Sequence, residues 1–176
     1  MTEETVKPSA FPSPPDASPS SQNVRFLHSC GEWEAWIDEG TGIYWLQCLA
    51  GQCLVDDACA WEGGEAVTFE YDEAVAACPG GTRLPTIEEL MGLLGDCDEI
   101  DFGTNMTGFC NTCAGSPACD AIYPGTEELE LTSTEAVHWS STALNDSKMW
   151  RINFLSGLVD ATLKEMSGTA VCVRSE

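Results

Sequence analysis

Two groups of residues in this sequence carry side chains that catalysis or anion binding commonly uses. His138 stands beside Ser140 and Ser141, which could supply a base and a nucleophile. Neighbouring strand residues point to opposite faces, however, and no glycine-flanked elbow surrounds either serine, so we expect no hydrolase. Arg83 could bind an anion, but its five donors also suit a brace that ties carbonyl groups of adjoining loops together, and we favour this structural role.

The 10 cysteines offer either metal or disulfide chemistry. Cys110 and Cys113 have the spacing of zinc and redox motifs, and Cys97 and Cys119 could complete four zinc ligands. The surrounding run NTCAGSP is typical of a loop rather than of the helix start that a thiol oxidoreductase needs. An even number of dispersed cysteines favours disulfides, and hence an oxidising compartment.

An acidic run offers oxygen ligands at near-alternate positions, as calcium prefers, through Asp96, Asp98 and Asp101. It lacks the twelve-residue EF-hand pattern and its terminal glutamate. Calcium is therefore the candidate cofactor, and a solvated acidic face is the alternative.

Asn145 and Asp146 match the Asn-Asp pair with which calcium-dependent lectins bind sugar, although the accompanying Glu-Pro-Asn type of loop is absent. We take this pair as candidate ligand-binding residues. Trp33 and Trp36 could also stack on a sugar, whereas we expect Trp139 and Trp150 to have structural roles, since most tryptophans in small domains belong to the core.

A first short helix is predicted over residues 68–78. Tyr71, Ala74, Val75 and Cys78 fall at i, i+3, i+4 and i+7, so they share one face and the cysteine points into the core.

A second helix follows, and its apolar residues repeat this spacing: Ile87, Leu90, Met91 and Leu94. Thr86 is the predicted N-cap, Glu89 completes a capping box, and Pro85 stops any earlier helix. Gly95 is predicted to end the helix.

The C-terminal part changes to strand periodicity. Trp150, Ile152 and Phe154 alternate with polar residues, residues 156–157 signal a turn, and a second alternating run follows, which predicts a hairpin with one buried face. The residues expected on that face of the second strand are Val159, Ala161 and Leu163. Further strands are predicted over residues 42–46 and 169–174. This order of elements indicates an α+β domain.

The chain has 176 residues and a formal charge of -22, so nucleic acid and anionic membrane surfaces should repel it. Residues 1–23, rich in proline and serine, are predicted to be a disordered tether, and residues 24–176 a single domain with a cysteine-rich insertion at about 97–131. The first residues lack the basic and apolar regions of a signal peptide, and no apolar run approaches the roughly 20 residues of a spanning helix. We therefore expect no direct membrane insertion.

Six motifs that follow Asp38 in order carry a family resemblance. They are TGIYW at 41–45, YDEAVAAC at 71–78, RLPTIEEL at 83–90, WSST at 139–142, MWRINF at 149–154 and VCVR at 171–174. Residues 36–176 thereby resemble a bacterial cell-surface domain, the C-terminal domain of the Lcl collagen-like adhesin and its relatives. The family often has an aromatic residue where His138 stands, and its middle loop seldom holds so many cysteines.

The resemblance implies a C-type-lectin-like fold with two short helices, a small twisted antiparallel sheet and long disulfide-stapled loops. It also implies a disulfide from the first helix to the final strand, between Cys78 and Cys172. The other cysteines then divide into an early set and a middle set, each expected to form two bridges with its pairing left open. The early set is Cys30, Cys48, Cys53 and Cys59, and the middle set is Cys97, Cys110, Cys113 and Cys119.

Together these observations predict a non-catalytic binding or adhesion module at the cell surface or in the extracellular space. Its irregular surface between residues 97 and 145 would bind a surface glycan, a matrix polymer or a protein. Two alternatives stay open. One is a self-associating subunit or decoration of a surface filament, and the other is an oxidase of the formylglycine-generating type, which would need a reactive cysteine pair.

Overall fold

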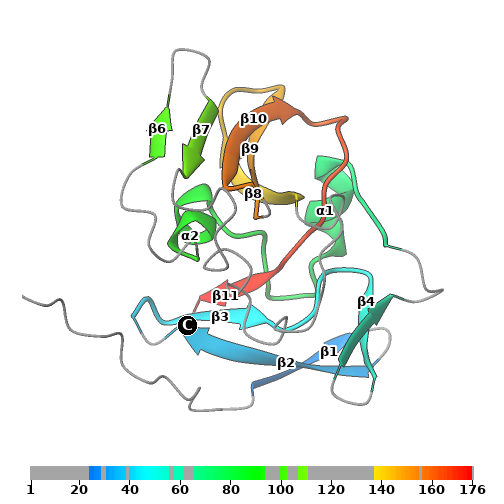
Figure 1. Cartoon of the computed structure of the whole chain (residues 1–176). Coiled ribbons are helices and arrows are strands. Elements are labelled where there is room, and N and C mark those ends of the chain that lie inside the picture. The colour runs from blue at the N-terminus through cyan, green and yellow to red at the C-terminus, as the bar shows by residue number, and fades with distance from the viewer. Residues whose placement is uncertain are drawn as a thin grey trace, which may run out of the picture.

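The computed structural model describes residues 24–28, 31–38, 40–55, 58–61, 66–93, 100–102, 107–110, 137–154 and 156–175. In Figure 1 a four-stranded sheet lies at the bottom and a five-stranded sheet at the top, with one short helix between them and the other at the right of the upper sheet. The two helices and the antiparallel sheets confirm the α+β class. The proposed tether, residues 1–23, lies outside the described residues.

The four-stranded sheet has the order β1-β2-β3-β11, and every neighbouring pair is antiparallel. Its strands are β1 (Val24–His28), β2 (Gly31–Asp38), β3 (Ile43–Leu46) and β11 (Val173–Ser175). Asp38 closes the turn between β2 and β3: its carboxylate accepts hydrogen bonds from the Gly40 amide at 2.9 Å and the Thr41 hydroxyl at 2.6 Å. Gly42 follows with φ 71°, a backbone conformation that favours glycine.

The five-stranded sheet has the order β6-β7-β10-β9-β8. Its strands are β6 (Ile100–Phe102), β7 (Thr107–Cys110), β8 (Val137–Ala143), β9 (Lys148–Asn153) and β10 (Leu158–Leu163). A separate two-stranded sheet pairs β4 (Gln52–Val55) with β5 (Ala58–Trp61). The expectation of one small sheet was therefore wrong, because the described residues alone form three.

The hairpin predicted near the C-terminus is present as β9 and β10, with a turn at Gly157, whose φ is 65°. Its buried face is shorter than the alternation predicted. Val159 is buried, but Leu163 is 46% exposed, because it is the last residue of β10 and pairs with Lys148 at the first position of β9.

The last predicted strand, over residues 169–174, was also too long. Strand β11 begins only at Val173. The residues before it form backbone hydrogen bonds with several different segments instead of continuing one ladder. The Thr169 carbonyl accepts from the Trp139 amide at 3.0 Å, whereas the Ala170 carbonyl accepts from the Ala50 amide at 2.8 Å. This segment therefore runs between the five-stranded sheet and the β3 side of the molecule, as Figure 1 shows.

Helix α1 (Tyr71–Ala77) begins three residues later than predicted. Phe69 is held in an isolated bridge with Gly168, and Glu70 is the N-cap, with a capping box completed by Glu73. Ala74 is fully buried, but Val75, expected on the packed face, is 48% exposed because no described element covers that flank of the helix.

Helix α2 (Ile87–Gly92) has Thr86 as its N-cap and buries Ile87 and Leu90. It ends earlier than the predicted stop at Gly95, which lies outside the described residues with Leu94. Leu93 is the C-cap, and its amide donates to the Leu90 carbonyl at 3.1 Å, a tightened last turn.

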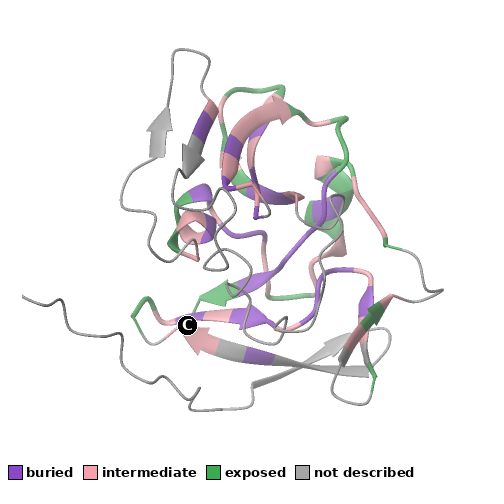
Figure 2. Ribbon diagram, in the orientation of Figure 1, coloured by how far each residue is buried: buried purple, intermediate pink, exposed green. Residues whose placement is uncertain are grey.

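The core forms two clusters of buried side chains. One cluster includes Trp45 of β3, Leu90 of α2 and Ile152 of β9, with Trp150 partly buried against it. The other includes Leu46, Ala74 of α1 and Trp139 of β8. Figure 2 shows the buried positions concentrated where the sheets and helices face each other.

Two disulfides have both of their cysteines among the residues that the structure describes. Cys78, just after α1, is bonded to Cys172, just before β11, 94 residues apart in sequence. Cys48 is bonded to Cys59 within the early set, and Cys53 is also disulfide-bonded. The remaining predicted disulfide residues, Cys30 and the middle set, have side chains outside the described part of the chain.

Candidate functional site

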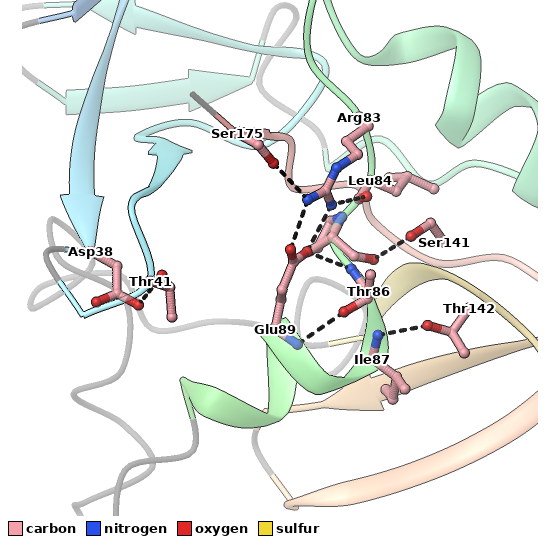
Figure 3. Close-up of polar contacts among 11 residues, drawn as sticks. Asp38, Thr41, Arg83, Leu84, Thr86, Ile87, Glu89, Ser141, Thr142 and Ser175 are labelled. Carbon is pink, nitrogen blue, oxygen red and sulfur yellow. Dashed lines mark hydrogen bonds and ion pairs between the residues drawn. The ribbon is translucent and has the colours of Figure 1, made fainter.

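The joint before α2 holds the densest group of polar contacts among the described residues (Figure 3). The Thr86 hydroxyl accepts from the Glu89 amide at 3.2 Å, and the Glu89 carboxylate accepts from the Thr86 amide at 2.7 Å. This is a capping box, which satisfies two amides at the helix start.

Arg83 donates two hydrogen bonds to the Glu89 carboxylate, each 2.7 Å long. It also donates to the Leu84 carbonyl and to the Ser175 hydroxyl, both at 3.1 Å. Only one of its partners is a carbonyl, so the predicted brace of loop carbonyls is replaced by a bidentate ion pair. These hydrogen bonds lower the pKa of Glu89 and raise that of Arg83, and so both groups stay charged.

The same joint is tied to β8 by hydroxyl groups. Ser141 donates from its amide to the Pro85 carbonyl at 2.7 Å, and its hydroxyl donates to that carbonyl at 3.2 Å. The Thr142 hydroxyl accepts from the Ile87 amide at 2.9 Å, in the first turn of α2. The start of α2 is thus fixed against the five-stranded sheet.

The Ser140 hydroxyl donates to the Trp150 carbonyl at 2.8 Å, so it bridges β8 to β9. His138 is fully buried, and its Nδ1 lies 3.2 Å from the Thr169 hydroxyl. Because that hydroxyl donates its own proton to the Val137 carbonyl at 2.8 Å, it must accept from His138, which places the ring proton on Nδ1. Burial lowers the pKa of His138 to about 3, and these groups do not form a nucleophile and base pair.

Trp139 is fully buried and makes both a hydrogen bond and an aromatic contact. Its indole N–H donates to the Phe69 carbonyl at 2.9 Å, and the Tyr71 ring meets it edge-on with centroids 5.7 Å apart. A Cβ at Gly168 would lie 3.0 Å from Trp139 Nε1, so this close approach requires glycine.

The sequence reasoning missed an ion pair across the hairpin. Arg151 of β9 donates from Nε to Asp160 Oδ1 at 2.9 Å and from Nη2 to Asp160 Oδ2 at 3.2 Å. The two residues are direct partners in the β9 and β10 register. Counting outward from the turn at Gly157 would have paired them.

The turn between β8 and β9 contains the two candidate ligand-binding residues, and both are exposed. Asn145 Oδ1 accepts three hydrogen bonds, from the Ser147 amide at 3.0 Å, the Ser147 hydroxyl at 3.1 Å and the Lys148 amide at 3.0 Å. This oxygen shapes the turn, and only the Asn145 amide N–H₂ and the Asp146 carboxylate are left to face a ligand. The role of this pair in ligand binding stays a prediction.

The predicted calcium residues, Asp96, Asp98 and Asp101, have side chains outside the described residues, as do Trp33 and Trp36. Within the described part of the chain, no three His, Cys, Asp or Glu side chains gather as metal ligands would. The described helices include none that is long and apolar enough to cross a membrane.

A protein-family model, the Lcl C-terminal domain, matches residues 34–174. The chain belongs to the Lcl C-terminal domain family. Searches of curated proteins and of solved structures found no match. Membership of this family suggests a domain of a bacterial surface protein, and the disulfides fit an extracellular domain.

Proposed function

We propose that this chain is a non-catalytic binding or adhesion module that acts outside the cytoplasm. The proposal rests on one observation: the side chains that could have been catalytic make structural contacts within the fold. The Ser140 and Ser141 hydroxyls donate to backbone carbonyls, and Arg83 forms an ion pair with Glu89. These groups brace a scaffold, and a braced scaffold can present variable loops without loss of the fold.

We further infer a C-type-lectin-like arrangement. Three features support it: the last strand β11 pairs with the early strand β3, the domain has two short helices, and a disulfide connects the end of α1 to the final segment. Such an arrangement fixes both ends of the domain and leaves the long central segment to vary.

The proposed ligand is a surface glycan, a matrix polymer or a protein, and nucleic acid is excluded by charge. A chain with a formal charge of -22 repels phosphate backbones. The binding surface is assigned to residues 97–145 other than the buried His138, Trp139 and Ser140 of β8, and Asp146 in the exposed turn after β8 borders this segment in sequence. Calcium stays the proposed cofactor for the acidic run at its start.

A glycan and matrix-polymer array, probed with the disulfide-intact chain, tests this function. The array should give ligand-specific signals. Repeating the array with calcium and with a chelator shows whether binding depends on the metal. Asp146→Ala should weaken the signal if the turn contributes, whereas Glu88→Ala, an exposed acid on α2, is the matched control. Silence across the array, combined with self-assembly seen by light scattering, would replace this proposal with the filament subunit.

One observation keeps the decoration of a surface filament as a second candidate: Val75, Leu163 and Met166 are exposed apolar side chains that a filament protein could cover. The alternative of a formylglycine-generating type of oxidase has less support. It needs a reactive cysteine pair, and the five cysteine side chains that the structure describes are all in disulfides. Non-reducing mass spectrometry of all ten cysteines tests it directly.

A further inference from the structure

Exposed apolar side chains lie on two segments that meet at the start of α1: the helix itself and the segment that leaves β10. The Tyr71 amide donates to the Lys164 carbonyl at 2.9 Å, and the Met166 amide donates to the Leu163 carbonyl at 3.1 Å. Val75 lies one helical turn beyond Tyr71 on the same face of α1. Figure 2 shows exposed stretches on both segments, which run side by side.

Three of the four large apolar side chains that are exposed among the described residues belong to this surface. Val75 is 48% exposed, Leu163 46% and Met166 47%. The fourth, Val55, lies on β4 in the two-stranded sheet. Single exposed apolar residues are common, whereas exposed apolar residues gathered on adjoining segments are typical of an interaction site.

The rim of the surface is acidic. Glu70, Asp72, Glu73 and Glu165 are exposed on the two segments, and Lys164 supplies the one positive charge, so four negative charges against one positive leave a local charge of -3. The Lys164 ammonium group lies 5.4 Å from the centre of the Tyr71 ring, at the inner edge of the surface.

We propose that this surface, defined by Val75, Leu163 and Met166, docks a basic, amphipathic segment of a partner protein. Apolar side chains of the partner would cover the three exposed residues, while its Lys or Arg side chains would face Asp72 and Glu165. Charge decides against a second copy of this chain as the occupant, because two copies would bring two rims of charge -3 and two molecules of charge -22 together. The surface consists of residues outside the proposed ligand-binding segment 97–145. The docking proposal can therefore be tested independently of the proposed function.

Three synthetic helical peptides test the proposal against the disulfide-intact chain. The first has a leucine face and a lysine face, the second replaces lysine with glutamate, and the third replaces leucine with serine. Fluorescence anisotropy at low and physiological salt should show binding of the leucine and lysine peptide, with much weaker binding of the other two.

Three protein variants locate the binding. Leu163→Ser combined with Met166→Ser should lower the affinity for the leucine and lysine peptide about tenfold or more, because two half-exposed side chains lose apolar contact. Val55→Ser is the matched control and should leave the affinity within about twofold. Asp72→Asn should reduce the salt dependence of binding. All four positions are exposed, and circular dichroism checks that each variant is folded.

Several outcomes would overturn the proposal. Absence of binding by the leucine and lysine peptide is one, and equal binding by the serine and lysine peptide is another, because it would reduce the effect to net charge. An equal loss in Val55→Ser would place the site elsewhere. Sedimentation velocity tests whether a second copy of this chain occupies the surface. If the wild-type chain self-associates and the double variant does not, a second copy is the occupant and the proposal is wrong.

Discussion

Acidification should destabilise this domain through the buried His138. Its side chain is 1% exposed, its Nδ1 contacts the Thr169 hydroxyl, and the Phe154 ring packs against it with centroids 5.0 Å apart. Neither Thr169 nor Phe154 carries a charge that could stabilise an imidazolium. Burial accordingly lowers the pKa of His138 from 6.5 to about 3.

The sign and size of the effect follow from this pKa. The folded protein binds the proton less readily than the unfolded chain, so stability is fully present above about pH 6.5 and is lost as the pH falls toward 3. Proton linkage with these two pKa values gives a loss of about 2 kcal/mol between pH 7 and pH 5, and about 3 kcal/mol by pH 4.

Urea unfolding at pH 7 and pH 5 measures this loss, and His138→Phe provides the comparison. Phenylalanine keeps an aromatic ring at the site but cannot take up a proton. Carboxylates such as Glu89, whose pKa is lowered by its hydrogen bonds to Arg83, contribute equally to both proteins. The free energy of unfolding of the variant should therefore fall by about 2 kcal/mol less than that of the wild type over this pH range.

Equal losses in the two proteins would refute this reasoning, since the titrating group would then lie elsewhere. An NMR titration of the His138 ring protons gives an independent test that does not depend on the variant. A folded-state midpoint above pH 6 would contradict the assignment of a buried, neutral ring hydrogen-bonded through Nδ1.

Three further perturbations test the scaffold. Replacing Cys78 and Cys172 together with alanine should cost about 4 kcal/mol, measured by calorimetry, because the bridge joins residues 94 apart; an unchanged melting temperature would contradict this. Glu89→Gln should cost about 1 kcal/mol in urea unfolding, since the Arg83 side chain is 40% exposed, and a difference that does not shrink in high salt would argue against the ion pair. Asn145→Ala should cost about 1 kcal/mol through the β8 to β9 turn, and Asn145→Asp should recover most of it if the side-chain oxygen is responsible.

Local signals in the sequence predicted local structure well. Thr86 and Glu89 are three residues apart, and a capping box depends on that spacing alone. The hairpin of β9 and β10 was likewise predictable, because alternation and a turn signal surround one short connection. The pattern also placed Val75 and Leu163 on apolar faces, but periodicity does not say how far a neighbouring element covers a face.

Contacts between distant segments could not be predicted in this way. The Ser141 hydroxyl reaches the Pro85 carbonyl 56 residues away, and Gly168 is required only because Trp139 lies against it. Arg83 was expected to bind carbonyls, since nothing in its neighbourhood showed that the capping residue Glu89 would turn both carboxylate oxygens toward it. Such partners are chosen by tertiary packing, which one sequence does not display.

The position of the Cys78 and Cys172 bridge also determines how the domain would respond to mechanical tension. A pull from both flanks would pass from the early strands through α1 to Cys78, across the bridge to Cys172, and out through β11. The 94-residue span between the two cysteines, roughly 300 Å of extended chain, would bear no load. All strands of the five-stranded sheet belong to that span, so this half of the domain would keep its shape while the flanking strands yielded.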